Sequence, residues 1–104
     1  MPNEKPDKPI EPIHPGKLLQ NRIINGNDLT VGETANLLGI SRDMLSKLIH
    51  GKYNFTADMC VRVAQVFGEN AEDWATMQMR YDLQQAEKKI KELNLKRHCH
   101  YRKP

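Results

Sequence analysis

Apolar residues recur along this chain at intervals of three and four positions, which is the spacing of a helix with one buried face. Five segments show this spacing, and no stretch of the sequence alternates polar and apolar residues as a half-buried strand does. The pattern therefore predicts an all-α protein of five helices, in which the first four are short and the fifth is long.

The first helix is expected to begin at His14-Pro15, with Leu18, Leu19 and Ile23 on its buried side. Proline is well tolerated at the first helical position, where its missing N–H has no helical partner to lose. Residues 1–13 hold most of the prolines among charged residues, so we expect a flexible proline-rich arm before the helix.

Two short helices joined by a tight turn are predicted between residues 30 and 51. Thr30 and Glu33 form a capping box at the start of the first, and Gly39 suits a helix end that needs positive φ. Ser41 is the expected N-cap of the second helix, and Gly51 ends it. The predicted buried positions are Ala35, Ile40, Leu45, Leu48 and Ile49. This geometry is typical of a pair that presents its second helix to the DNA major groove.

The outward residues of that second helix have the chemistry of a base-reading surface. Arg42 can pair with guanine O6 and N7, and Asp43 can accept from cytosine N4. The residues that follow the helix carry groups that usually contact phosphates. We expect DNA contacts from Thr30, Ser41, Arg42, Asp43, Ser46, Lys47, His50, Lys52, Tyr53 and Asn54.

The fourth helix is predicted from an N-cap at Thr56 to Phe67, with Cys60 as a small buried residue, and the fifth begins after Asn70. In the fifth helix, Trp74, Met77 and Tyr81 are expected to complete the core. A second apolar set, shifted by one position, forms a narrow seam that favours contact with a partner helix or groove. The residues of this predicted partner seam are Leu83, Ala86, Ile90 and Leu93.

Composition is consistent with one small domain that binds an anionic polymer. The chain has 104 residues, a net charge of +3 and an isoelectric point near 9.0, and 38% of its residues are hydrophobic. Residues 41–55 contain three cationic residues and one acidic residue, Asp43, and the basic tail 96–104 contains no acidic residue. The domain itself is expected over residues 14–95. Positive charge is thus concentrated where phosphates are expected.

Several other function classes find little support in the residues. The polar amino end and the lack of a long apolar run predict no signal peptide and no membrane contact, and two isolated cysteines favour the cytoplasm. No metal or other cofactor is expected, because the adjacent residues His98, Cys99 and His100 cannot all face one ion. No nucleophile–base pair or carboxylate cluster indicates an enzyme such as a nuclease.

From His14 to Leu83 the chain resembles the HigA-type (VapI-like) antitoxins of the Xre helix-turn-helix family. The matching motifs are His14-Pro15-Gly16, Ala35-x-x-x-Gly39-Ile40-Ser41, Leu48-x-x-Gly51-Lys52, Thr56-x-Asp58-Met59 and Trp74-x-x-Met77-Gln78-x-x-Tyr81-Asp82-Leu83. The resemblance implies a five-helix, lambda-repressor-like fold with an extended C-terminal helix, and DNA contacts from Ser41, Arg42, Asp43, Ser46, Lys47 and Lys52. Val31-Gly32 departs from the family, in which many members begin this helix with a polar residue that touches DNA.

The resemblance also implies a function and its partners. It predicts a homodimer that binds an inverted-repeat operator on double-stranded DNA, represses its own operon, and neutralises a HigB-like ribonuclease toxin without catalysis of its own. An Xre-type regulator that has no toxin partner remains an alternative. For the seam from Leu83 to Leu93 three uses stay open, in order of preference: a dimer interface, a toxin-docking surface and an amphipathic extension.

Overall fold

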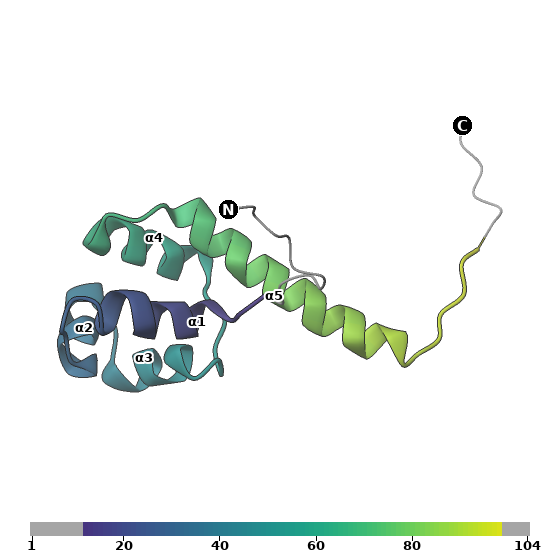
Figure 1. Cartoon of the computed structure of the whole chain (residues 1–104), viewed down its shortest axis with the longest axis horizontal. Helices are drawn as coiled ribbons and strands as arrows, with labels where there is room; N and C mark the ends of the chain where they lie inside the picture. Colours follow the sequence, from purple (N-terminus) through teal and green to yellow (C-terminus); the bar gives the residue numbers. More distant parts are fainter. Residues whose placement is uncertain (1–11, 99–104) are drawn as a thin grey trace, which may run out of the picture.

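The computed structural model describes residues 12–98 and, over that range, is all-helical (Figure 1). Its elements, in chain order, are α1 (Pro15–Leu18), η1 (Leu19–Ile24), α2 (Val31–Leu38), α3 (Arg42–Ile49), α4 (Ala57–Phe67) and α5 (Ala71–Lys91). Since α1 continues directly into η1, residues 12–98 form five helical rods, and the predicted fold class is confirmed. The first eleven residues of the expected proline-rich arm and residues 99–104 of the basic tail, including Cys99 and His100, lie outside the described residues.

The first rod differs in detail from the sequence expectation, because η1 is a π-helix. The N–H of Asn25 donates to the carbonyl of Gln20, five residues earlier, at 2.9 Å. A π-helical turn is wider than an α-helical one. It brings Leu19, Ile23 and Ile24 onto one buried face, whereas Leu18 is only half-buried.

The predicted helix caps are present. The Thr30 hydroxyl accepts from the Glu33 N–H at 3.0 Å, and a Glu33 carboxylate oxygen accepts from the Thr30 N–H at 2.9 Å. Gly39 ends α2 with φ of 71°, a left-handed conformation that favours glycine. The Ser41 hydroxyl then accepts from the Met44 N–H at 3.0 Å and begins α3.

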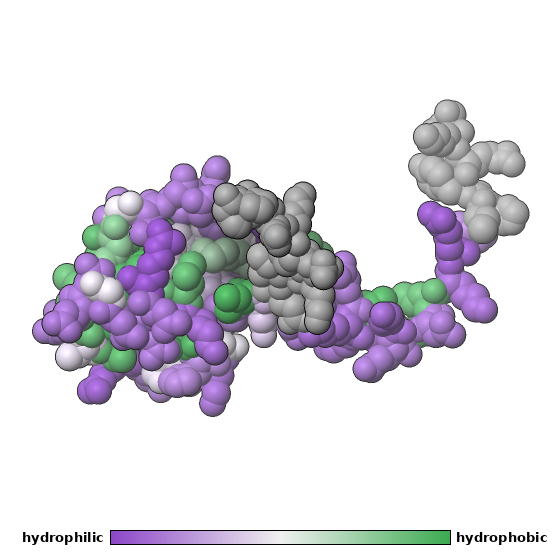
Figure 2. Space-filling view, viewed as in Figure 1, coloured by the Kyte–Doolittle hydropathy of each residue, from purple (hydrophilic) through white to green (hydrophobic). Residues whose placement is uncertain are grey.

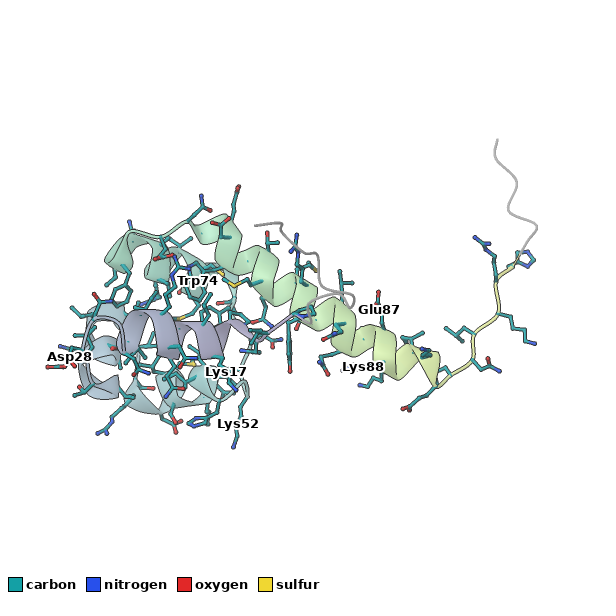
Figure 3. The ribbon with its side chains drawn as sticks, in the orientation of Figure 1. Lys17, Asp28, Lys52, Trp74, Glu87 and Lys88 are labelled. Carbon is teal, nitrogen blue, oxygen red and sulfur yellow. The ribbon has the colours of Figure 1, made fainter. Side chains whose placement is uncertain are left out.

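The core lies between the first rod, α2, α3, α4 and the first half of α5. Trp74 is 1% exposed, and Figure 3 shows it inside the body. Its indole stacks on Phe55, with 5.6 Å between ring centroids, so this phenylalanine, which periodicity did not mark, is a core residue. The buried thiol of Cys60 confirms the predicted core position, and burial raises its pKa.

The two halves of α5 have different surroundings. Up to Gln78 the helix packs against the body, and beyond Tyr81 it projects away from it (Figure 1). Leu83 and Ile90 are exposed, as expected of an unpartnered seam. Leu93, the last residue of the predicted seam, lies just beyond the helix: α5 ends at Lys91, and the Leu93 N–H donates to the Ile90 carbonyl in the turn that follows. Figure 2 shows hydrophobic surface at this outer end among hydrophilic neighbours.

No helix within residues 12–98 combines the length and the hydropathy that crossing a membrane requires.

Candidate nucleic-acid interface

The position of α3 is set by what packs behind it. Leu45 and Leu48 are almost completely buried, and Ile49 is 6% exposed. At the far end of α3 the backbone of α1 approaches directly: a Cβ atom on Gly16 would lie only 1.8 Å from the Leu48 carbonyl oxygen. No side chain fits there, so glycine lets α1 press against α3 and hold its orientation.

Arg62, on α4, supports the turn between α2 and α3. One of its guanidinium nitrogens donates to the Leu38 carbonyl at 2.8 Å and to the Gly39 carbonyl at 3.3 Å, and Nε pairs with Asp58. These carbonyls end α2 and have no helical partner, so the guanidinium satisfies them. Sequence reasoning missed this residue, because its spacing from Asp58 indicates only a surface ion pair.

The front of α3 is exposed, as the polar pattern predicted. Arg42, Asp43 and His50 are exposed, whereas Ser46 and Lys47 are half-buried. No residue in the range 12–98 forms an ion pair with Arg42, which leaves its planar group open to a ligand. Met44 on α3, which the sequence analysis did not include, is 38% exposed.

Lys47 lies in a small cluster with Asp43 and Tyr53. Its ammonium is 3.2 Å from the Asp43 carboxylate, donates to the Tyr53 hydroxyl at 3.4 Å and lies 5.1 Å from the centroid of that ring. The hydrogen bond with Asp43, followed by that with Tyr53, raises the pKa of Lys47. Three of the predicted contact residues are thus brought together, and Asp43 reduces the positive charge that Lys47 presents.

The His50 ring also has a defined orientation. Its Nδ1 lies 2.7 Å from the Ser46 carbonyl oxygen, which accepts but cannot donate. Nδ1 therefore carries the proton, and in the neutral ring Nε2 is an acceptor.

The Lys52–Asn54 loop is held against the end of α3. The N–H groups of Lys52 and Tyr53 both donate to the Lys47 carbonyl, at 2.8 and 3.3 Å. Gly51 makes the reversal possible with φ of 73°. All three loop residues are exposed, and Figure 3 shows Lys52 at the edge of the body. Thr30 lies apart from this group, at the start of α2, where its oxygen already accepts in the capping box.

His14 caps the first helix from inside the body. Its Nδ1 accepts from the Gly16 N–H at 2.9 Å, and Nε2 is buried without a hydrogen bond. Burial lowers the pKa of His14, against the opposing effects of the Tyr53 backbone and the Asp82 charge. The Tyr81 ring meets it edge-on at 5.0 Å. Over the described range, no three His, Cys, Asp or Glu side chains form a group able to hold a metal ion.

Gln78, which the sequence analysis named only as part of a family motif, also supports this site. It is 5% exposed and donates to Asn54 across the junction between α5 and the loop. It follows Trp74 by four positions, which places it on the same buried helix face. That spacing was a usable signal, although a polar residue is not counted in an apolar pattern.

Comparison with known proteins matches the helix-turn-helix family HTH_3 to residues 21–74. Virulence-associated protein I of Dichelobacter nodosus is 30% identical over 83 residues, which cover 80% of this chain and 77% of that protein. An addiction module antidote protein of a HigA family from Coxiella burnetii has a TM-score of 0.75 at 28% identity, covering 86% of this chain and 100% of that one. A Pseudomonas aeruginosa protein in complex with its operator DNA has a TM-score of 0.73 at 25% identity, covering 85% and 100%.

Proposed function

The chain belongs to the helix-turn-helix family HTH_3, and we propose that it is a homodimeric antitoxin that represses its own operon and neutralises a HigB-like ribonuclease. The observation that carries the DNA-binding part is the exposed front of α3, which Gly16 and Arg62 brace from behind. The antitoxin part is supported by the likeness to an antidote protein of a HigA family.

In this proposal the amino end of α3 enters the major groove. Arg42 pairs with a guanine, and a good bidentate contact of this kind contributes about 1–3 kcal/mol of discrimination. Ser41, Asp43 and Ser46 contact neighbouring base edges, and His50 follows at the far end of the helix. In a homodimer the two α3 helices lie about 34 Å apart, one turn of DNA, so the operator is an inverted repeat.

Phosphate contacts come from the residues around α3. Cationic or donor groups are presented by Lys47 near the end of α3 and by Lys52, Tyr53 and Asn54 after it, and Thr30 presents a hydroxyl at the start of α2. Such contacts orient a protein on DNA without reading sequence. They also make its affinity depend on salt.

In this proposal the projecting half of α5 makes the contacts with other protein chains. Leu83, Ala86 and Ile90, with Leu93 in the turn that follows, are assigned to the homodimer. The toxin is neutralised by binding alone, and this chain contributes no catalytic group. Whether the toxin binds at the dimer surface or at the DNA surface is tested by measuring whether it displaces the second copy of this chain or the DNA.

Co-expression with the adjacent reading frame tests the antitoxin role. The neighbour expressed alone should arrest growth, and expressed with this chain it should co-purify as a stable complex without arrest. A harmless neighbour that does not bind would leave an Xre-type regulator without a toxin. Footprinting of the DNA upstream of the gene tests the repressor role and should show two protected half-sites about one helical turn apart.

A further inference from the structure

Gln78 is a buried polar residue on the half of α5 that packs against the body. Only 5% of its surface is exposed. A buried amide destabilises a fold unless its polar atoms find partners. Both ends of the Gln78 amide do so: Asp82 is a partner on α5 itself, whereas Asn54 and Phe55 lie in and directly after the loop that carries the proposed phosphate contacts.

The partners allow only one orientation of this amide. Oε1 accepts from the Phe55 backbone N–H at 2.7 Å, while Nε2 donates to the Asp82 carboxylate at 2.9 Å. A backbone N–H can only donate and a carboxylate can only accept, so turning the amide over would break both bonds. Gln78 therefore presents an N–H, and not its oxygen, to Asn54.

This orientation determines which end of the Asn54 side chain faces outward. Its Oδ1 accepts from Gln78 Nε2 at 3.3 Å, so the amide oxygen is turned towards the body. The Asn54 NH2 group has no hydrogen-bond partner among residues 12–98, and the residue is exposed. Phosphate oxygens accept hydrogen bonds but do not donate them, so an outward NH2 group suits DNA and an outward carbonyl repels it.

We propose that Gln78 is a positioning residue for DNA binding, which, held by Asp82, turns the amide of Asn54 so that its N–H donors face a DNA phosphate. The inference rests on the proposed function, because it assumes that Asn54 lies at the DNA interface. It also links α5, the helix assigned to protein contacts, to the loop assigned to DNA.

Gln78→Glu is the informative substitution. An ionised glutamate keeps the acceptor for the Phe55 N–H but cannot donate, so Asn54 has to turn its NH2 group inward and its oxygen towards the phosphate. Gln85→Glu, at an exposed position of the same helix, introduces the same charge without touching the loop and is the matched control.

Binding is measured with a duplex covering the region upstream of the gene and with a scrambled duplex. Gln78→Glu should weaken binding to both duplexes by a similar factor, because phosphate contacts carry no sequence information. The expected loss of affinity is about tenfold, the effect of losing one hydrogen bond to a charged group. Gln85→Glu should stay close to the wild type. In an Asn54→Ala background, Gln78→Glu should have little further effect.

The wild-type chain provides a second measurement that does not depend on the variant folding. In NMR spectra, the side-chain NH2 resonances of Asn54 should shift when the upstream duplex is added. Unchanged Asn54 resonances in a bound complex would overturn the inference. So would a loss of affinity from Gln78→Glu that is equally large in the wild-type and the Asn54→Ala backgrounds. Normal binding by a folded Gln78→Glu variant would overturn the role of Gln78 alone, whereas a wild-type chain that binds neither duplex would overturn the proposed function as well.

Discussion

The front of α3 and the outer half of α5 are both exposed, but the body supports only the first. The inner face of α3 buries Leu45 and Leu48, and the backbone at Gly16 approaches it closely, so its polar face has a defined position before any ligand arrives. Past Tyr81, α5 projects from the body, and its seam residues Leu83 and Ile90 remain exposed. The first surface is preorganised, whereas the second becomes buried only through a partner.

This difference separates two ways in which a small domain binds. A rigid polar face loses little conformational freedom on binding, so it can use its contacts for specificity. An exposed apolar stripe gains most from the removal of its surface from water, so it favours another protein. The two surfaces should therefore respond differently to substitution.

Removing the support behind α3 should have the largest effect. Leu45→Ala deletes a fully buried side chain and should lower the free energy of unfolding by about 2–5 kcal/mol. Met79→Ala, on α5 and 58% exposed, is the control and should change it by no more than about 0.5 kcal/mol. Urea unfolding followed by circular dichroism measures both. Equal effects would mean that α3 is not braced by the core.

A charge in the α5 seam should leave the fold intact and weaken self-association. Ile90→Asp removes an apolar contact from the proposed dimer interface, and at about 1.5–3 kcal/mol for one buried side chain the dissociation constant should rise at least tenfold. Sedimentation equilibrium measures it, with Gln85→Asp as a control on the same helix. If Ile90→Asp dimerises as well as the wild type, the seam is not the dimer interface and toxin docking becomes its proposed role.

Arg42 and Lys52 should separate base reading from phosphate binding on the α3 side. Arg42→Ala should weaken the free energy of operator binding by about 1–3 kcal/mol and relax the base preference at one base pair of each half-site. Lys52→Ala should weaken all duplexes alike and reduce the slope of log affinity against log salt by about one. Titrations at several salt concentrations test both, and a uniform loss for Arg42→Ala would remove it from the base-reading residues.

The smallest expected effect is a pH dependence at the junction of the two regions, where His14 meets Tyr81. Because burial lowers the pKa of His14 below 6.5, the unfolded chain binds a proton more readily than the folded one. Its contribution to stability is therefore present above 6.5 and is lost as the pH falls towards the lowered value. In unfolding experiments across that pH range, the free energy of unfolding of His14→Asn should fall less steeply with decreasing pH than that of the wild type. Asparagine keeps a cap acceptor but does not titrate.

The helices and their caps were predictable from local sequence, because the interactions that end a helix lie within a few residues. The box of Thr30 and Glu33, the positive φ of Gly39 and the N-cap of Ser41 are all of this kind. The π-helical turn of η1 was not, since tertiary packing selects which of Leu18, Leu19, Ile23 and Ile24 enter the core.

For the candidate interface, the sequence by itself determined the chemistry of the exposed face: Arg42 at the start of α3, donors after it, and an apolar seam far along α5. Only the tertiary structure decided how these groups are held. Arg62 reaches the end of α2 and Gln78 reaches Asn54, across 24 positions each. The reason is physical, because periodicity reports which face of a helix is buried, whereas a hydrogen bond between distant segments exists only after those segments have packed together.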